Sequence, residues 1–329
     1  MLRAQYDSRG PVPQDVIHAV ESETPRPGPG QALVEVVAAP INPSDLLTLT
    51  GEYDRLPPLP ATGGGEGVGR VVELGPAASG PGAGRLVLLP VGCGTWSTHV
   101  VVDAERLVPL PDDADPLQLA MMTINPPTAA LLLSEFVQLE PNEWVVQNAA
   151  NSAVGLYVVQ LARQRGHRTV NVVRRQGATE VVRDTGGDVV LVDGDGLADR
   201  VAEATGGARI RLGFDAVGGT ATGRLANCLD RDATLVSYGR MSGEPCTLQP
   251  DAFIFRNLTL RGFWLANWFR ETPTEQRTAL FGEIARRIAT GDLHAPIHAT
   301  YDVGEIREAV AAAAGGGRSG KILIVPRHT

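Results

Sequence analysis

The fold is decided by the stretch Trp144-Val-Val-Gln-Asn-Ala-Ala-Asn-Ser-Ala-Val-Gly155, which runs on into Leu156–Gly166. Its first four residues form a short apolar run, long enough for a buried strand, and Asn148–Ser152 is a turn of small polar residues. Ala153–Arg165 then carries apolar residues at helical spacing and is followed by a glycine, a common helix C-cap. Thr169–Val173 is a second, β-branched strand. Strand, turn, helix and strand in this order form the unit that places a phosphate at a helix N-terminus.

The turn is a degenerate form of the glycine pattern that binds dinucleotides. Counted back from Gly155, the pattern G-x-G-x-x-G would have two further glycines, where the chain has Ala150 and Ser152. Small residues still let the backbone approach a pyrophosphate, and polar side chains in the turn add hydrogen-bond donors. The residues that this pattern assigns to cofactor binding are Asn151, Ser152, Ala153 and Val154.

Two arginines follow the second strand. An NAD site has an Asp or Glu at this place for the ribose hydroxyl, whereas the chain has Arg174 and Arg175. A guanidinium pair suits the 2′-phosphate of NADPH, because each group can form bidentate, charge-assisted bonds with phosphate oxygens. The alternative is a solvated basic turn without a ligand. The sequence thus predicts a site that prefers NADPH.

Length and composition limit the class of protein. A chain of 329 residues exceeds the size at which one core stops growing, so two domains are expected. An apolar content of 43% and a charged content of 20% are typical of a soluble globular protein, and a net charge of -8 argues against nucleic acid as a partner. No apolar run reaches the length of a membrane span, so no membrane partner is expected.

The N-terminal segment and the cysteine content point to a reducing compartment. Met1–Gly10 has no hydrophobic signal core and acidic residues follow soon after it, so neither an export nor a transit peptide is expected. The three cysteines, Cys93, Cys228 and Cys246, are scattered and odd in number, which argues against a disulfide framework. We therefore expect a cytoplasmic protein.

The chain has two regions with different sequence patterns. Up to about residue 120, short strand candidates alternate with Pro/Gly clusters, a pattern typical of a barrel or sandwich. These candidates are Val16–Val20, Ala32–Ala39, Val68–Leu74, Leu86–Pro90 and Thr98–Val102. From Pro116 onward helical segments alternate with strands, which indicates a parallel sheet covered on both faces. The later strand candidates are Val189–Val192, Leu212–Val217, Thr234–Ser237 and Leu258–Arg261.

The C-terminal part is too small to stand alone. It has a helix pattern at Thr274–Thr290, a strand at His298–Tyr301, a helix at Val303–Ala314 and a strand at Ile322–Val325. We expect this part to return to the first domain. The predicted fold class is therefore α/β, with a β-barrel domain and a doubly wound parallel sheet.

Several motifs resemble those of one family. They are Ile41-Asn-Pro-Ser-Asp45, Gly51-Glu-Tyr53, Gly63-Gly-Gly-Glu-Gly67, Gly94-Thr-Trp-Ser97, Asn125-Pro-Pro-Thr128, Gln147–Gly155, Asn171-Val-Val-Arg174, Tyr238-Gly-Arg-Met241 and Leu260-Arg-Gly-Phe-Trp264. The chain resembles the medium-chain dehydrogenase/reductases, and most of all the zinc-independent 2-enoyl thioester reductases of mitochondrial fatty-acid synthesis (the trans-2-enoyl-CoA reductase type). The resemblance implies a GroES-like catalytic domain at residues 1–121 and 268–329, a Rossmann NADPH-binding domain at 122–267, and a homodimer through Rossmann-sheet edges.

The residues argue against a metal. Asn42 and Gly65 stand where zinc-dependent members of the superfamily have a Cys and a His, and three cysteines cannot form a four-cysteine structural zinc site. His294 and His298 are the only histidines at i,i+4 spacing. We expect a protein without zinc.

The resemblance points to Tyr53 as the catalytic proton donor. This residue lies in the loop-like stretch Thr50–Asp54. A phenol, with an ordinary pKa of about 10, keeps its proton at neutral pH and can deliver it to a reacting carbon. The alternative is an exposed tyrosine that packs its ring in a loop. Asp45 is expected to fix its own loop rather than perform chemistry.

The resemblance also assigns residues near strand ends. Tyr238, Gly239, Arg240 and Met241 follow a strand end, where ligands bind in open α/β sheets. The resemblance places Phe263, Trp264 and Leu265 at the cofactor, Asn125 at its nicotinamide end with Thr128 on the same helix, and Lys321 at a cofactor phosphate. Asn42 and Trp264 are assigned to the substrate pocket. Core packing, helix capping and a solvated lysine are the alternatives to these roles.

The reaction implied is reduction of a conjugated C=C bond. It needs a hydride near the β-carbon, a donor for the enolate oxygen and one acid. We therefore predict NADPH-dependent reduction of a trans-2-enoyl thioester, on coenzyme A or acyl carrier protein, with hydride added at Cβ and a proton at Cα. A zinc-free reductase of another activated alkene or quinone, and a non-catalytic NADPH-binding protein, stay as alternatives. Gln176–Gly187 is shorter than the insertion of relatives, which leaves chain length and carrier open.

Overall fold

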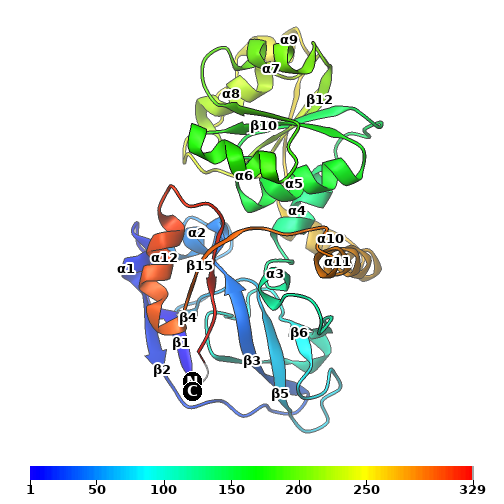
Figure 1. Ribbon diagram of the computed structural model, residues 1–329. Helices are drawn as coiled ribbons and strands as arrows, with labels where there is room; N and C mark the ends of the chain where they lie inside the picture. The colour runs from blue at the N-terminus through cyan, green and yellow to red at the C-terminus, as the bar shows by residue number, and fades with distance from the viewer. Residues whose placement is uncertain (328–329) are drawn as a thin grey trace. The chain divides into compact units, whose positions relative to one another are not determined.

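The chain forms two compact units (Figure 1). The computed structural model describes residues 1–327; unit 1 comprises Met1–Ile124 with Phe281–Thr329, and unit 2 comprises Asn125–Leu280. The sequence predicted one domain at 1–121 with 268–329 and another at 122–267. Both of these boundaries lie earlier in the chain than those of the two units, and the predicted division stays a prediction. The last two residues of the chain, His328 and Thr329, lie outside the described part.

Unit 2 is built on one parallel sheet. Its strands are β9 (Trp144–Gln147), β10 (Arg168–Val173), β11 (Val189–Val192), β12 (Ile210–Asp215), β13 (Thr234–Ser237) and β14 (Thr259–Gly262). They pair in the order β11-β10-β9-β12-β13-β14, and every pair is parallel. This is the doubly wound order of a Rossmann fold, and its winding reverses between β9 and β12. The predicted parallel sheet is confirmed, although β12 ends two residues before the expected Val217.

Helices cover both faces of this sheet. The helices of unit 2 are α4 (Asn125–Leu132), α5 (Ala153–Gln164), η2 (Gln176–Ala178, a 3-10 turn), α6 (Thr179–Asp184), α7 (Leu197–Thr205), α8 (Gly219–Asn227), α9 (Pro250–Ile254) and α10 (Leu265–Glu271). Figure 1 shows α5 and α6 on one face and α7 and α8 on the other. Val170 and Val172 of β10 pack with Leu197, whereas Val173 packs with Val182 on the opposite face. Burial on both faces explains why these strands are almost continuously apolar.

Unit 1 contains two sheets of mainly antiparallel strands. The strands are β1 (Leu2–Tyr6), β2 (Ile17–Glu21), β3 (Gln31–Pro40), β4 (Ala61–Thr62), β5 (Val68–Leu74), β6 (Leu86–Leu88), β7 (His99–Asp103), β8 (Val108–Pro109), β15 (Ile297–Tyr301) and β16 (Lys321–Ile324). The larger sheet has the order β15-β16-β3-β5-β6-β8 with β7 paired to β3, and the smaller has the order β2-β1-β4. Because β16 pairs with β3, the C-terminal part returns to the first unit, as expected.

Short helices connect the strands of unit 1. They are α1 (Pro13–Val16), α2 (Pro43–Thr50), the 3-10 turn η1 (Ala104–Arg106), α3 (Pro116–Leu119), the 3-10 turn η3 (Val303–Glu305) and α12 (Ile306–Ala314). α11 (Thr274–Ala289) contains the boundary between the two units. The strand expected at Val16–Val20 begins one residue later, because α1 precedes it, and β1 was not predicted at all.

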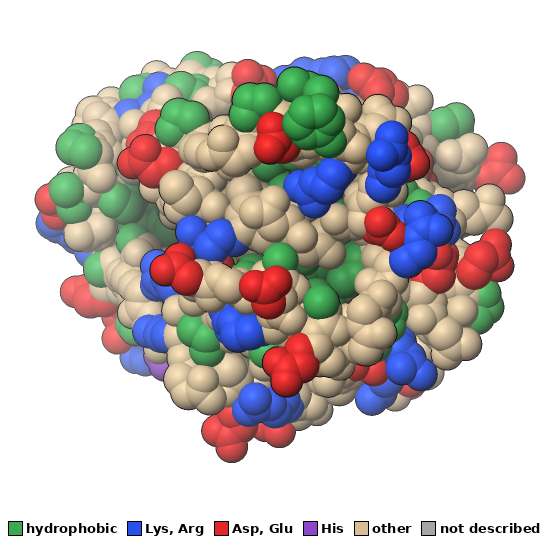
Figure 2. All heavy atoms as spheres, turned by 90° about the horizontal axis from the view of Figure 1, so that it is seen from above, with side chains coloured by type: hydrophobic (Ala, Val, Ile, Leu, Met, Phe, Trp, Pro, Cys, Tyr) green, Lys and Arg blue, Asp and Glu red, His purple; other side chains and the backbone are tan. Residues whose placement is uncertain are grey.

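Charged side chains of both signs are interspersed on the face drawn in Figure 2, and its hydrophobic side chains form small separate groups. The net charge of -8 is therefore not gathered into one acidic patch on this face. Among residues 1–327, no helix has both the length and the apolarity that crossing a membrane requires.

Leu49 fastens α2 to the core of unit 1, where it is 1% exposed and clusters with Tyr6, Trp96 and Ile306. We expect Leu49→Ala to lower the free energy of unfolding by about 2–5 kcal/mol, because it removes buried methyl groups and leaves a cavity. Urea unfolding followed by circular dichroism measures the loss. Val91→Ala, at a residue that is 50% exposed, is the control and should change stability by about 0.5 kcal/mol or less. Equal losses in the two variants would contradict this packing.

Candidate cofactor and catalytic site

The predicted phosphate-binding turn lies at the N-terminus of α5. Ser152 is the N-cap, and its Oγ accepts a hydrogen bond from the N–H of Gly155 (3.1 Å). Gly155 cannot carry a side chain without displacement, since a Cβ there would lie 2.5 Å from the carbonyl oxygen of Ala150. The predicted contacts Asn151, Ser152, Ala153 and Val154 are all partly exposed in this turn. A helix N-terminus with unpaired N–H groups attracts an anion.

Gln147 connects this turn to the sheet by hydrogen bonds. It is fully buried at the end of β9, and its Nε2 donates to the carbonyl of Gly155 (2.9 Å) and to Oδ1 of Asn171 on β10 (2.8 Å). The first turn of α5 is thereby fixed to two neighbouring strands. Sequence reasoning gave Gln147 no role, because it was counted within an apolar run.

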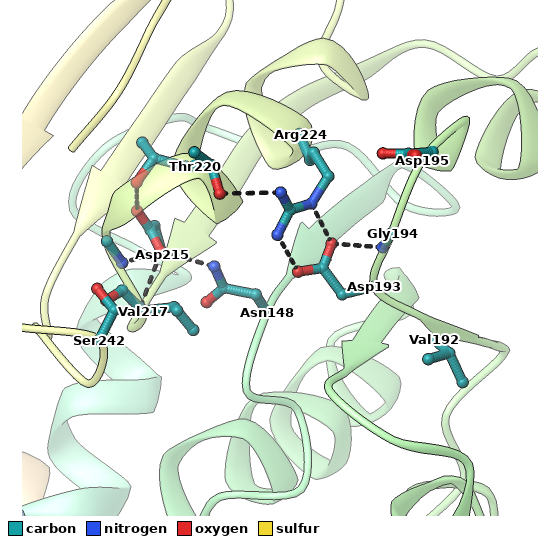
Figure 3. Close-up of polar contacts among 12 residues, drawn as sticks. Asn148, Val192, Asp193, Gly194, Asp195, Asp215, Val217, Thr220, Arg224 and Ser242 are labelled. Atoms are coloured by element: carbon teal, nitrogen blue, oxygen red, sulfur yellow. Dashed lines mark hydrogen bonds and ion pairs between the residues drawn. The ribbon is translucent and has the colours of Figure 1, made fainter. Parts of the chain in front are cut away.

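Asp215 ties the same turn to the next strand of the sheet (Figure 3). Its fully buried carboxylate accepts four hydrogen bonds, from Asn148 Nδ2 (2.6 Å), Thr222 Oγ1 (2.6 Å), Val217 N (2.9 Å) and Gly218 N (3.1 Å). Asn148 Oδ1 in turn accepts from the N–H of Ala216 (2.8 Å). These bonds join the ends of β9 and β12, where the winding of the sheet reverses and ligands bind in such folds. The missed signal was an acid at the end of a buried strand, followed closely by two glycines.

The other predicted cofactor residues of unit 2 follow neighbouring strands. Arg174 and Arg175 are exposed just beyond β10. Tyr238, Gly239, Arg240 and Met241 follow β13, with Tyr238 N donating to the Asp215 carbonyl (2.9 Å) and Met241 N to that of Ala216 (3.0 Å). Phe263, Trp264 and Leu265 follow β14 and lead into α10. Because all these strands are parallel, the structure brings the three groups and the α5 turn to the same end of the sheet, at the carboxyl ends of its strands.

Asn125 and Thr128 lie on α4, where both side chains are buried, at 6% and 7% exposure. α4 packs against α5, and the guanidinium of Arg165, the C-cap of α5, donates to the carbonyl of Ala130 (3.2 Å). The expected nicotinamide role of Asn125 and the cofactor role of Thr128 stay predictions.

Tyr53 belongs to unit 1 and follows the C-terminus of α2. Gly51 caps that helix in the left-handed conformation (φ 83°), and the N–H groups of Glu52 and Tyr53 both donate to the carbonyl of Leu47 (2.8 and 3.1 Å). The guanidinium of Arg9 donates to the carbonyl of Pro57 on the far side of the loop. Tyr53 itself is half-buried. The loop is therefore anchored on both sides of the predicted proton donor.

A buried polar cluster holds the N-terminus of the same helix. Lys321 Nζ donates to Asn42 Oδ1 (2.5 Å) and to the carbonyl of Ile41 (2.9 Å), and Asn42 Nδ2 donates to Glu66 Oε1 (2.7 Å). Asp45 accepts from the N–H of Asn42 (2.8 Å), so it fixes its loop as expected. The ligand roles expected for Lys321 and Asn42 stay predictions, since the structure gives both side chains partners inside unit 1.

The three ionisable groups of this cluster are strongly perturbed. Burial raises the pKa of Glu66 to about 7, against the opposing effects of the Lys321 ammonium and the Asn42 hydrogen bond. Burial likewise raises the pKa of Asp45 to about 6 and lowers that of Lys321 to about 8. In each case the charged form has lost water that its neighbours replace only in part.

Glu66→Gln tests this account through the pH dependence of stability. Because the folded-state pKa of Glu66 lies above its ordinary 4.5, its contribution is fully present below about pH 4.5 and is lost as pH rises through 7. We expect the variant to lose about 1–3 kcal/mol less stability than the wild type between pH 5 and 8. Urea unfolding at several pH values measures this slope. Glu73→Gln, at an exposed position of β5, should keep the wild-type slope; a wild-type slope in Glu66→Gln would refute the assignment.

Two family models match the chain. The model described as alcohol dehydrogenase GroES-like domain matches residues 28–112, and the one described as zinc-binding dehydrogenase matches residues 153–280. A zinc ion does not fit the side chains present: within residues 1–327, no group of three or more His, Cys, Asp and Glu could hold a metal. Asn42, at the position where zinc-dependent members have a Cys, is hydrogen-bonded to Lys321 and Glu66.

Curated relatives match most of the chain. The mitochondrial enoyl-[acyl-carrier-protein] reductase of Xenopus tropicalis is 37% identical over 300 residues, which cover 88% of this chain and 85% of the relative. The protein of the same name from Rattus norvegicus is 36% identical over 285 residues, which cover 85% and 76%.

The names of these relatives contradict the expected cytoplasmic location. They and the relative from Homo sapiens are all described as mitochondrial. The expectation was wrong because scattered cysteines report only a reducing compartment, and a reducing organelle meets that criterion as well as the cytoplasm does.

Solved structures share the fold of the whole chain. A putative NADPH:quinone reductase from Bacillus thuringiensis has a TM-score of 0.89 at 28% identity and covers 99% of each chain. The mitochondrial 2-enoyl thioester reductase Etr1p/Etr2p heterodimer from Candida tropicalis has a TM-score of 0.88 at 25% identity, covering 98% of this chain and 99% of that one. The complex of Etr1p with NADP and crotonyl-CoA has a TM-score of 0.87 at 26% identity, with the same coverage.

The strand order of unit 2, the mainly antiparallel sheets of unit 1, both family models and the curated relatives all indicate the same family. The chain belongs to the zinc-independent enoyl thioester reductases of the medium-chain dehydrogenase/reductase superfamily.

Proposed function

We propose that this NADPH-dependent oxidoreductase reduces the C=C bond of a trans-2-enoyl thioester, carried by coenzyme A or acyl carrier protein. The observation that carries the proposal is the match over 88% of the chain to a relative named as an enoyl-[acyl-carrier-protein] reductase. The similarity to a structure that contains NADP and crotonyl-CoA supports the same class of substrate.

The residues of unit 2 fit the cofactor. The first turn of α5 contains no acidic side chain, so nothing there opposes a pyrophosphate at its N–H groups. Arg174 and Arg175 are exposed beyond β10 and would take the 2′-phosphate by bidentate bonds. The groups Tyr238–Met241 and Phe263–Leu265, at the same end of the sheet, would contact the rest of the dinucleotide, with Asn125 and Thr128 of α4 at the nicotinamide end.

Tyr53 would perform the acid step. NADPH, when bound, supplies the hydride that adds to the β-carbon of the thioester. The phenol of Tyr53 then gives its proton to the α-carbon, so that its O–H bond breaks as the new C–H bond forms, and solvent restores the proton. Backbone bonds to Leu47 hold Tyr53 in place for this transfer.

A quinone reductase is the second candidate. The structure from Bacillus thuringiensis, which covers 99% of this chain, is described as a putative NADPH:quinone reductase. Comparing kcat/KM for crotonyl-CoA with that for small quinones, at saturating NADPH, separates the two functions. The non-catalytic alternative has no specific observation in its favour.

We also propose a homodimer formed through unit 2. β14 is an outer strand of the six-stranded sheet, and the chain just before it exposes Phe253 (43%), Ile254 (69%) and Phe255 (64%). An outer strand beside exposed apolar side chains favours association with another strand edge. A related structure, that of Etr1p with Etr2p, is a heterodimer.

Ile254→Lys combined with Phe255→Glu should convert the dimer to monomers, because charged groups would have to be buried at the contact. Sedimentation velocity measures the state. Val91→Lys, at an exposed residue of unit 1, is the control and should stay dimeric. A wild type that sediments as a monomer would end the proposal.

Tyr53→Phe should lower kcat with crotonyl-CoA by about 10²–10⁴-fold, because general acid catalysis contributes that much. The Kd of NADPH should stay unchanged, since Tyr53 lies in the other unit. NADPH oxidation and fluorescence titration measure the two quantities. Tyr301→Phe, in β15, is the matched control and should keep wild-type turnover. Full activity of the Tyr53 variant would remove this residue as the acid.

A further inference from the structure

An ion pair at the end of β11 has no role in the site described so far. Arg224, on α8, donates from Nε to Asp193 Oδ1 (2.7 Å) and from Nη2 to Asp193 Oδ2 (2.6 Å). Arg224 Nη1 also donates to Thr220 Oγ1 (3.0 Å), and Asp193 accepts from the N–H of Gly194 (2.9 Å) (Figure 3). The two side chains are 32% and 21% exposed. The pair is therefore bidentate, fixed in direction and partly withdrawn from water.

Asp193 follows β11 next to the point where the two arginines follow β10. β10 and β11 are parallel neighbours with Val173 opposite Val192, and the N–H of Asp193 donates to the carbonyl of Val173 (2.8 Å). Neighbouring strands lie about 5 Å apart, so the chain leaves the sheet at Asp193 and at Arg174 side by side. An anion held by Arg174 and Arg175 would be close to this carboxylate.

A carboxylate without a partner at this place would oppose a phosphate. A phosphate monoester carries about -1.5 to -2 charges at neutral pH, and charges within about 8 Å are poorly screened at physiological salt. With Arg224 bound, the pair has no net charge, and the attraction of the two arginines beyond β10 is undiminished. The same loop carries Asp195, whose backbone carbonyl accepts a hydrogen bond from Arg200 of α7 (3.4 Å).

We propose that Arg224 is a specificity-determining residue, which favours NADPH over NADH by cancelling the charge of Asp193 beside the 2′-phosphate. The inference rests on the proposed function, which gives that phosphate to Arg174 and Arg175. Without Arg224, Asp193 becomes a free acceptor at a strand end, the kind of group that NAD sites use for ribose hydroxyls. The weakening should therefore fall on NADPH alone.

A charge-removal cycle tests this, with the Kd of NADPH and of NADH measured by fluorescence titration. Arg224→Met should raise the Kd of NADPH about tenfold and leave that of NADH within about twofold, since truncating one partner frees the other's charge. Asp193→Asn should lower the Kd of NADPH by about threefold, because the Arg224 cation then has no counter-charge and adds to the attraction of the phosphate. The double variant should return the ratio of the two Kd values to near wild type.

Arg211→Met is the matched control. Arg211, on β12, forms an equally bidentate pair with Glu143 (2.9 and 2.6 Å), with side chains 35% and 27% exposed. This pair lies at the other end of the strands, away from the predicted phosphate, so the Kd ratio should not change. If Arg224→Met and Asp193→Asn weaken both cofactors alike, the pair is structural and the proposal is overturned.

Arg174→Ala with Arg175→Ala separates this inference from the function on which it rests. If that variant keeps its NADPH preference, the 2′-phosphate is bound elsewhere, and the roles proposed for Arg174, Arg175 and Arg224 all fall, whereas the proposed reductase activity is tested separately by turnover of crotonyl-CoA. If it loses the preference while Arg224→Met keeps it, only the role of Arg224 falls. Should Arg224→Met not fold, as judged by circular dichroism, Asp193→Asn decides alone: tighter NADPH binding supports the inference and weaker or unchanged binding overturns it.

Discussion

The cofactor half of this protein depends on one buried carboxylate. Asp215 is fully buried, and a buried charge is tolerated only when its oxygens are hydrogen-bonded. Its four donors come from the end of β9, from the turn that follows β12 and from α8. These bonds therefore fix the loop after β9 relative to the loop after β12. The N-terminus of α5 follows the first of these loops, so its position is fixed as well.

Elements with a strong local pattern could be predicted from the sequence. Val68–Leu74, Trp144–Gln147, Val189–Val192 and Thr234–Ser237 were found residue for residue, because each apolar run is bounded by turn residues. β1 was missed although Arg3 and Gln5 alternate with its apolar residues, the pattern of a half-buried strand; it has no apolar run, and it pairs with β2 and β4. β12 was extended too far because Ala216 and Val217 look like strand residues, while Asp215 turns the chain.

The positions of the candidate site could be predicted only where a motif is contiguous. The turn from Asn148 to Gly155 was recognisable, but its bond to Asp215 spans 67 residues and leaves no local pattern. Lys321 and Asn42 are 279 residues apart, so their direct hydrogen bond could not be foreseen either. The family resemblance named both residues as ligand contacts, which stay predictions, and the geometry adds that they lie at the N-terminus of α2, the helix that Tyr53 follows.

The pairing of β16 with β3 also sets an order of assembly during synthesis. A ribosome makes β3, Glu66 and Asp45 early, but Lys321 is added only after all of residues 125–280. Until then the nascent chain exposes part of an edge of β3 and keeps two carboxylates without their buried cation. An unpaired strand edge is a site for aggregation or for chaperone binding. The unit that contains Tyr53 therefore cannot complete its larger sheet until the cofactor-binding unit has been translated.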